Sequence, residues 1–293
     1  MISCLRGGRF GAAVLLLAAC GLVAADAPDA RAQDIALAKP AGAAHVALPA
    51  ALPGPSPDCK STRTAGERFR RPLPGLRRAV RGNGAVKVLV VGSSTTVGVG
   101  ASSPTQAYVA RLETDLEGYL KGLDFDVMGR GQSGEVAQGA ADRMKKEVQG
   151  TKPDLVIWQV GTNDAISHVD PERFRNCLRT TLDWLAESRI DVVLVNPQYG
   201  DKLASDSYYG EIVKIIAEVA SEKRVLLVDR FEAMKELSRV HGDRFYLTSD
   251  NLHMNDAGHR CMAEQLARGI VAGILMAEGE QAAAPPTTTA RPQ

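Results

Sequence analysis

Short apolar segments alternate along the middle of the chain with segments of helical hydrophobic spacing. The apolar segments are four to six residues long and rich in β-branched residues; they cover residues 86–91, 125–128, 155–160, 191–195 and 225–228. Helical spacing covers residues 107–120, 137–148, 174–186, 212–220, 231–237 and 257–275. Strands that are apolar throughout are typical of a parallel sheet covered on both faces. The alternation therefore predicts a doubly wound, mostly parallel five-stranded sheet in a three-layer α/β/α arrangement.

The amino-terminal end has the pattern of an export signal. Residues 1–32 contain early arginines, an apolar run over residues 10–25 and the small-x-small sequence Ala-Arg-Ala at residues 30–32. A run of sixteen apolar residues is shorter than the roughly 20 that span a bilayer as a helix. We therefore expect cleavage of a signal peptide and a periplasmic or secreted protein. A lipoprotein anchored at Cys20 is the alternative, because Leu-Ala-Ala-Cys resembles a lipoprotein box.

Residues 33–84 are rich in Ala, Pro and Arg and predict a tether, and residues 277–293 predict a disordered tail. One folded domain is then expected over residues 85–276. From Arg63 to Arg81 there are seven arginines and one acidic residue. This stretch is interpreted either as a solvated segment or as a contact with an anionic surface such as phospholipid or acidic glycan.

Composition and charge exclude several classes of protein. The chain has 293 residues, 45% hydrophobic and 24% charged, with 35 basic against 34 acidic residues and a formal net charge of +1. These values are typical of a soluble globular protein and argue against a disordered or fibrous one. A near-neutral chain lacks the basic field that nucleic acid binding requires. We expect a monomer with no nucleic acid partner.

Three of the five cysteines lie beyond the predicted signal peptide: Cys59, Cys177 and Cys261. Export would place them in an oxidising compartment, where one bridge and one thiol are expected. Cys59 would gain most from a bridge because it lies in a linker-like stretch. The spacing does not identify its partner; we take Cys261 as the candidate. None of the three has a neighbouring cysteine at ligand spacing, which argues against zinc and thiol redox chemistry.

The segment after the first predicted strand, residues 92–100, has the sequence GSSTTVGVG. A Walker phosphate loop requires lysine where Val99 stands, so that interpretation fails. A hydroxyl-rich loop for a flavin phosphate and a nucleophilic serine on a tight strand-to-helix turn both fit this segment. A purely structural turn is the third interpretation.

Glycine and asparagine follow the next two predicted strands. The glycine-rich residues 129–135 could present backbone N–H groups to an oxyanion. Residues 161–164, Gly-Thr-Asn-Asp, could direct a side-chain amide into the same cleft, because ligands of such sheets bind at the carboxyl ends of the strands. Each segment alone is equally compatible with a turn.

Near the carboxyl-terminal end, Asp250 precedes His253 by three residues. A carboxylate at this spacing in a loop can orient the imidazole while the other ring nitrogen faces a nucleophile. A metal site formed by Asp250, His253, Asp256 and His259 is the rival interpretation. Because the chain supplies no further obvious ligands, we expect no metal.

Together, four segments resemble the signatures of the SGNH, or GDSL, hydrolase superfamily: Gly92-Ser93-Ser94-Thr95-Thr96-Val97-Gly98, Gly131-Gln132-Ser133-Gly134, Gly161-Thr162-Asn163-Asp164 and Asp250-Asn251-Leu252-His253. The resemblance extends from residue 86 to about residue 275. It implies acyl transfer without a cofactor, with Ser94 as nucleophile and His253 as general base oriented by Asp250. Backbone N–H groups of Ser94 and Gly134 and the Asn163 amide would form the oxyanion hole. Ser93 replaces the usual aspartate, which leaves a swap of roles between Ser93 and Ser94 open.

The loop after the fourth predicted strand offers substrate-contact candidates in Tyr199, Tyr208 and Tyr209. Aromatic rings beside polar residues suit stacking against a sugar, whereas the alternative is a surface loop with incidental tyrosines. The hypothesis is a short-acyl esterase that removes O-acetyl groups from a glycan or small molecule. A lysophospholipase or thioesterase for longer acyl chains is the alternative. A non-catalytic glycan- or flavin-binding module on the same fold is the alternative from another class.

Overall fold

The computed structural model describes residues 48–49, 52, 54–60, 71–82 and 84–283, with side chains up to residue 277. At its centre is a five-stranded sheet in the order β2-β1-β3-β4-β5, with every neighbouring pair parallel. The strands are β1 (Val86–Gly92), β2 (Phe125–Gly131), β3 (Leu155–Gln159), β4 (Asp191–Val195) and β5 (Leu226–Val228). The predicted parallel sheet is confirmed.

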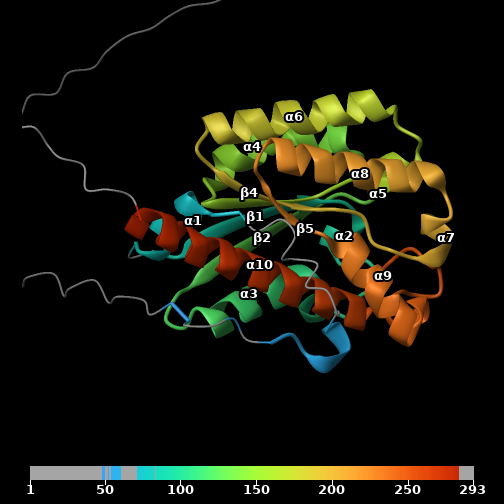
Figure 1. Ribbon diagram of the computed structural model, residues 1–293, viewed down its shortest axis with the longest axis horizontal. Helices are drawn as coiled ribbons and strands as arrows, with labels where there is room; N and C mark the ends of the chain where they lie inside the picture. The colour runs from blue at the N-terminus through green and yellow to red at the C-terminus, as the bar shows by residue number, and fades with distance from the viewer. Residues whose placement is uncertain (1–47, 50–51, 53, 61–70, 83, 284–293) are drawn as a thin grey trace, which may run out of the picture. The chain divides into compact units, whose positions relative to one another are not determined.

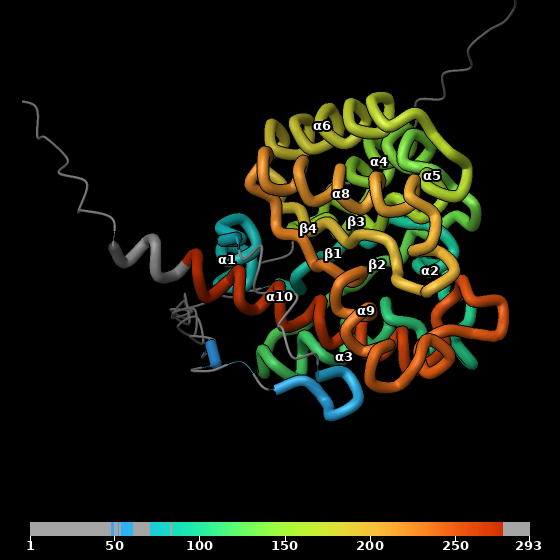
Figure 2. Tube along the Cα trace, turned by 45° about the vertical axis from the view of Figure 1, so that its right-hand side comes forward, coloured from blue at the N-terminus to red at the C-terminus, as the bar shows by residue number. Residues whose placement is uncertain are grey.

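Helices cover both faces of the sheet (Figures 1 and 2). One face packs against α1 (Pro74–Val80), α3 (Tyr108–Tyr119) and α10 (Asp256–Ala283). The other packs against α4 (Ala137–Thr151), α6 (Pro171–Glu187) and α8 (Ser207–Glu222). The remaining long helix, α9 (Arg230–His241), follows β5 and contributes side chains to both cores.

The two-sided cover explains why the strands are apolar throughout. Successive side chains of a strand point to opposite faces of the sheet. In β1, Val88 and Val90 enter the core under α3 and α10, whereas Leu89 and Val91 enter the core under α4. All four are fully buried, so no position of this segment favours a polar residue.

Three α-helices of four or five residues were not predicted: α2 (Ser94–Val97), α5 (Thr162–Ile166) and α7 (Asp201–Ala204). Helices of four or five residues are too short to show a hydrophobic period, which explains the omission. Two of the longer helices, α6 and α8, begin three and five residues earlier than their apolar spacing indicates. For example, α6 begins after Asp170, whose side chain accepts a hydrogen bond from the Arg173 N–H as an N-cap.

The folded domain extends beyond the predicted boundaries at both ends. Ahead of residue 85, helix α1 buries Leu76 and Val80 in the core. Cys59 and Cys261 form a disulfide that ties this amino-terminal part to α10, and Cys177 is a half-buried free thiol. Helix α10 continues to Ala283, past the predicted limit at residue 276. Parts of the segments predicted as tether and tail are therefore folded.

The predicted signal peptide, residues 1–32 with Cys20, lies outside the described residues. So do residues 61–70 of the arginine-rich stretch, while Arg77 of the same stretch is only 6% exposed and is not available to an anionic surface. In the part of the chain that the structure describes, no helix has both the length and the apolar character needed to cross a membrane.

Candidate active site

A sharp turn joins β1 to α2 and places Ser94 at the first position of the helix. Only glycine fits before this turn, since a Cβ on Gly92 would lie 2.2 Å from Thr96 Oγ1 and 2.7 Å from Gln159 Oε1. The Ser94 Oγ lies 3.1 Å from the Nε2 atom of His253. The turn thus brings the Ser94 hydroxyl to the histidine at the carboxyl edge of the sheet.

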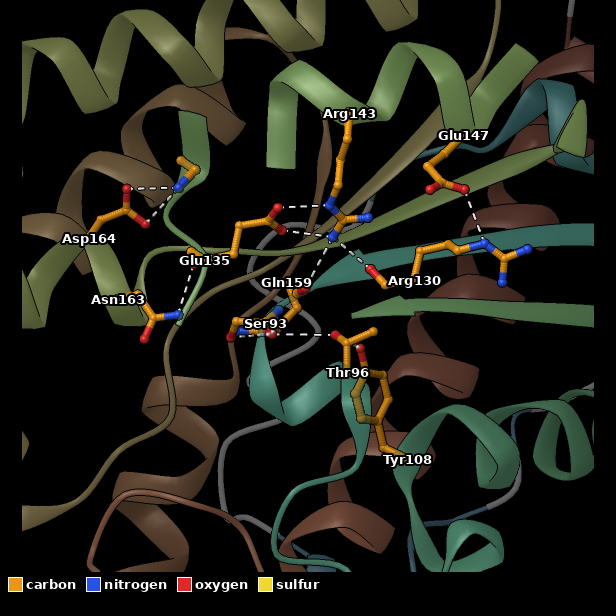
Figure 3. Close-up of polar contacts among 12 residues, drawn as sticks. Ser93, Thr96, Tyr108, Arg130, Glu135, Arg143, Glu147, Gln159, Asn163 and Asp164 are labelled. Carbon is orange, nitrogen blue, oxygen red and sulfur yellow. Dashed lines mark hydrogen bonds and ion pairs between the residues drawn. The ribbon is translucent and has the colours of Figure 1, made fainter. Parts of the chain in front are cut away.

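Ser93 is anchored inside the domain instead. Its backbone N–H and its hydroxyl both donate to Gln159 Oε1, at 3.0 and 3.2 Å, and the residue is 5% exposed. Figure 3 shows Ser93 and Gln159 together, next to the Thr96 and Tyr108 hydroxyls, which lie 2.7 Å apart. The contact with His253 therefore belongs to Ser94, and a swap of roles with Ser93 has no geometric support.

The loop that carries His253 is closed at its base and packed against the segment that follows α2. A bridge between Leu247 and Met254 holds the two ends of the loop together. Gly100 lies directly beside it with a φ of 94°, and a Cβ there would lie 2.1 Å from the Met254 carbonyl oxygen. Glycine at position 100 permits this close approach, which sets the separation of the two loops.

Asp250 holds the imidazole of His253 by a hydrogen bond of 2.6 Å between Oδ2 and Nδ1. Its Oδ1 accepts hydrogen bonds from the N–H groups of Leu252 and His253 and from the Thr248 hydroxyl. Partial burial opposes ionisation, but these hydrogen bonds prevail and hold the pKa of Asp250 well below its ordinary value. An ionised carboxylate can only accept, so Nδ1 carries the proton and Nε2 is free to accept from Ser94.

Three hydrogen-bond donors were predicted from the sequence to form an oxyanion hole: the N–H groups of Ser94 and Gly134 and the amide of Asn163. The backbone N–H groups of Ser94 and Gly134 donate to no acceptor within the described part of the chain. Asn163, on α5, uses one N–H of its amide to donate to the Glu135 carbonyl oxygen at 2.8 Å. The second N–H of the same amide has no acceptor among the described residues.

The turn that carries Gly134 is held by an ion pair that the sequence did not indicate. The guanidinium of Arg143 on α4 makes a bidentate ion pair with the Glu135 carboxylate, with Nε to Oε1 at 2.8 Å and Nη2 to Oε2 at 2.7 Å (Figure 3). The same guanidinium donates to the carbonyl oxygen of Arg130 at 2.8 Å. The hydrogen bond to Glu135 raises the pKa of Arg143, so the cation persists. Arg143 thereby joins α4 to the end of β2, and no local pattern around Arg143 signals this role.

Asp164 has a structural role beside Asn163. Both carboxyl oxygens accept from the Ala137 N–H at the beginning of α4, at 2.9 and 3.1 Å. Asp164 is 1% exposed, and burial raises its pKa to about 6. The sequence presented Asp164 as part of a motif, and Gln159 as a polar residue at the end of an apolar strand. The sequence thus marked both residues as unusual, but it did not show which groups they bind.

The three tyrosines named as substrate contacts do not form one surface. Tyr209 is 1% exposed, and its hydroxyl donates to the Gln198 carbonyl oxygen, so its expected stacking on a sugar is wrong. One ring face of Tyr208 is covered by His168 at 4.6 Å between centroids. Tyr199 packs edge-on against Phe231, and its hydroxyl donates to Asp201. Tyr199 and Tyr208 are half-buried, so contact of these two rings with a substrate stays a prediction.

The rival metal interpretation is not supported by the geometry. Asp250 and His253 bind each other, whereas Asp256 accepts hydrogen bonds from Ser102. His259 is fully buried; it accepts from the Tyr108 N–H, and its other ring nitrogen faces the Val99 carbonyl oxygen. Among the described residues, no three metal-ligating side chains converge.

Comparison with known proteins gives a consistent result. Esterase TesA of Pseudomonas aeruginosa is 25% identical over 173 residues, which cover 58% of this chain and 80% of that protein. An acetylxylan esterase of Geobacillus stearothermophilus is 27% identical over 179 residues, or 56% of this chain and 80% of that protein. The structure of a lipase/acylhydrolase from Enterococcus faecalis matches with a TM-score of 0.55 and 25% identity, over 64% of this chain and 95% of that chain.

Residues 58–276 match the family described as Non-GDSL lipase-like, which includes the whole sheet and all four motif segments. The family's description agrees with Ser93, which stands where a GDSL motif would have aspartate. The chain belongs to the Non-GDSL lipase-like family, of SGNH/GDSL type, and is an ester-hydrolysing enzyme.

Proposed function

We propose that this protein is a serine esterase in which Ser94 is the nucleophile, His253 the general base and Asp250 the group that orients the histidine. The observation that carries the proposal is the continuous chain of hydrogen bonds from Asp250 through His253 to Ser94, at 2.6 and 3.1 Å. Ser94 and His253 are 159 positions apart in sequence, so only the fold brings them together. Such a chain is the arrangement that activates a serine hydroxyl.

In the proposed reaction, Nε2 of His253 takes the proton of Ser94 as its oxygen attacks the ester carbonyl. The negative charge of the tetrahedral intermediate is met by the N–H groups of Ser94 and Gly134 and by the Asn163 amide. The carbon–oxygen bond to the alcohol then breaks, and the departing alcohol takes the proton from His253. Water attacks the acyl-enzyme in the same way, releasing the acid and restoring Ser94.

Replacing Asn163 with alanine is expected to lower kcat about 10²–10³-fold while KM stays within about threefold, because the amide is proposed to meet charge that develops only in the transition state. The measurement is steady-state kinetics on 4-nitrophenyl acetate. Asn176→Ala, an exposed asparagine on α6, is the matched control. A raised KM with unchanged kcat would instead show that Asn163 only binds substrate.

We infer a short-acyl substrate, with an O-acetyl group on a glycan as the natural case. The similarity to an acetylxylan esterase supports this inference.

One observation favours longer acyl chains: Val97 and Ile166 are 54% and 47% exposed, unusual for aliphatic residues of this size. Each lies three positions after Ser94 or Asn163 on the same short helix, and side chains at this spacing share a helix face. Together they would give the site an apolar rim.

A series of 4-nitrophenyl esters from acetyl to decanoyl distinguishes the two substrate classes. We expect kcat/KM to be highest for acetyl or propionyl and to fall for octanoyl and longer chains. A buried methylene changes transfer free energy by about 0.8 kcal/mol, so binding of a long chain would raise kcat/KM steeply along the series. A maximum at octanoyl or beyond would make the protein a lysophospholipase or thioesterase type of enzyme.

Export is proposed from the signal-like residues 1–32, with the periplasm or the medium as the destination. The disulfide between Cys59 and Cys261 supports the proposal, because disulfides persist in oxidising compartments. Such a location would place the esterase beside secreted polysaccharide and cell-wall glycans.

A further inference from the structure

Gln198, which follows β4, is a buried amide with three partners. It is 2% exposed. Its Oε1 atom accepts hydrogen bonds from the Thr162 hydroxyl and from the Arg230 guanidinium, both at 2.9 Å. Its Nε2 atom donates to the carbonyl oxygen of Leu252 at 2.8 Å. Both lone pairs of the amide oxygen and one of the two N–H groups are thus used inside the protein.

These partners lie directly beside the residues of the active site. Thr162 precedes Asn163, which carries the side-chain donor at the site, and Leu252 precedes His253. One side chain therefore joins the asparagine helix to the histidine loop. The segment that follows α2 contacts the same loop separately, through the close approach of Gly100 to Met254.

Arg230 decides which way the amide faces. The guanidinium is 1% exposed, and its Nε donates to the Asn196 carbonyl oxygen at 3.0 Å. Burial lowers the pKa of Arg230 to about 10, which still leaves it charged at neutral pH. Because a guanidinium only donates, the oxygen of Gln198 must face it. The nitrogen of the amide is then the atom left to reach the Leu252 carbonyl oxygen.

We propose that Gln198 is a positioning residue for ester hydrolysis: it sets the spacing between Asn163 and His253 by holding Thr162 with one end of its amide and Leu252 with the other. The inference rests on the roles proposed above for Asn163 and His253. A mutation outside the reacting groups that displaces one of them by about 1 Å can lower the rate about 10²-fold. Loss of the hydrogen bonds of Gln198 would allow such a displacement of Asn163 or His253.

The substitution Gln198→Glu distinguishes a positioning role of Gln198 from a contribution to the stability of the fold alone. The carboxylate keeps an oxygen for Thr162 and gains an ion pair with Arg230. It also places an acceptor against the Leu252 carbonyl oxygen, and the two oxygens repel. We expect a folded protein by circular dichroism, a kcat on 4-nitrophenyl acetate lowered about 10–100-fold, and a KM within about threefold of wild type. Gln138→Glu, the same change at an exposed position of α4, is the control and keeps wild-type kcat.

Titration of active sites with a fluorophosphonate probe completes the test. If Gln198 positions the site, all Gln198→Glu molecules are labelled in the end, but each turns over slowly. A reduced labelled fraction that turns over at the wild-type rate would mean a structural role only, and would overturn the inference. A folded Gln198→Glu variant with kcat within about twofold of wild type would also overturn it.

Should Gln198→Glu fail to fold, Thr162→Val carries the test, since it removes one hydrogen bond to the amide and preserves the shape of the side chain. A fall in kcat of about threefold or more at unchanged KM supports the inference, and wild-type kcat overturns it. Wild-type activity in Ser94→Ala would overturn the proposed function itself. An inactive Ser94→Ala beside fully active Gln198 and Thr162 variants would overturn only the positioning role.

Discussion

Replacing Ser94 with alanine is expected to lower kcat for 4-nitrophenyl acetate by about 10⁴-fold or more and to abolish labelling by a fluorophosphonate probe. The hydroxyl that contacts His253 at 3.1 Å is lost, and no second hydroxyl can replace it, because Ser93 is turned into the protein against Gln159. The melting temperature is expected to stay close to that of wild type, since Ser94 Oγ has no partner in the described structure other than the histidine.

Ser93→Ala is the matched control for this experiment. It removes one buried hydrogen bond to Gln159, which contributes about 0.5–1.5 kcal/mol to stability, and leaves the Ser94 hydroxyl in place. We expect a small decrease in melting temperature, full labelling by the probe and kcat within about tenfold of wild type. The opposite pattern, with labelling lost in Ser93→Ala and kept in Ser94→Ala, would reassign the nucleophile.

Asp250→Asn is expected to lower kcat about 10⁴-fold, because it places the histidine proton on the wrong nitrogen. The Oδ1 atom accepts from the Thr248 hydroxyl and from two backbone N–H groups, so the oxygen of an asparagine must occupy that position. Its NH₂ group then faces Nδ1 of His253, where the carboxylate oxygen lies at 2.6 Å. With Nδ1 forced to accept, Nε2 carries the proton and cannot take one from Ser94.

The measurement is kcat between pH 5 and 9, with Asp256→Asn as control. Asp256 also accepts two hydrogen bonds, both from Ser102, but does not contact His253. Because the pKa of Asp250 lies well below its ordinary value, the wild-type carboxylate stays ionised across this range, so low pH does not imitate the substitution. A kcat for Asp250→Asn within about tenfold of wild type at any pH would show that Asp250 does not orient the histidine.

The elements that sequence analysis predicted well are those with a long hydrophobic pattern. All five strands and six long helices were located, because burial on two faces makes a strand apolar throughout and burial on one face gives a helix its period. Strand β2 continues to Gly131, three residues beyond its apolar segment, because Arg130 and Gly131 pair with β1 at the edge of the sheet. Backbone pairing there requires no apolar side chain.

The boundaries of the domain depended on contacts that a local pattern does not contain. Helix α1 has seven residues, three of them charged or glycine, and its helical state comes from packing Leu76 and Val80 against the core. The segment around Cys59 is held by the bond to Cys261, 202 positions away. Tertiary packing and a covalent link thus order segments whose composition indicates a tether.

The sequence by itself determined the fold class and the chemical groups of the site. Strands buried on both faces are apolar throughout and can be recognised in the sequence, and the motif residues follow these strands at a common edge of the sheet. Only the tertiary structure decided which serine meets His253, which carbonyl Asn163 holds and which way Gln198 faces. The reason is physical: a hydrogen bond needs its two atoms within about 3 Å at a suitable angle. Partners such as Ser93 and Gln159, 66 positions apart, acquire that geometry only when the sheet and its two layers of helices are assembled.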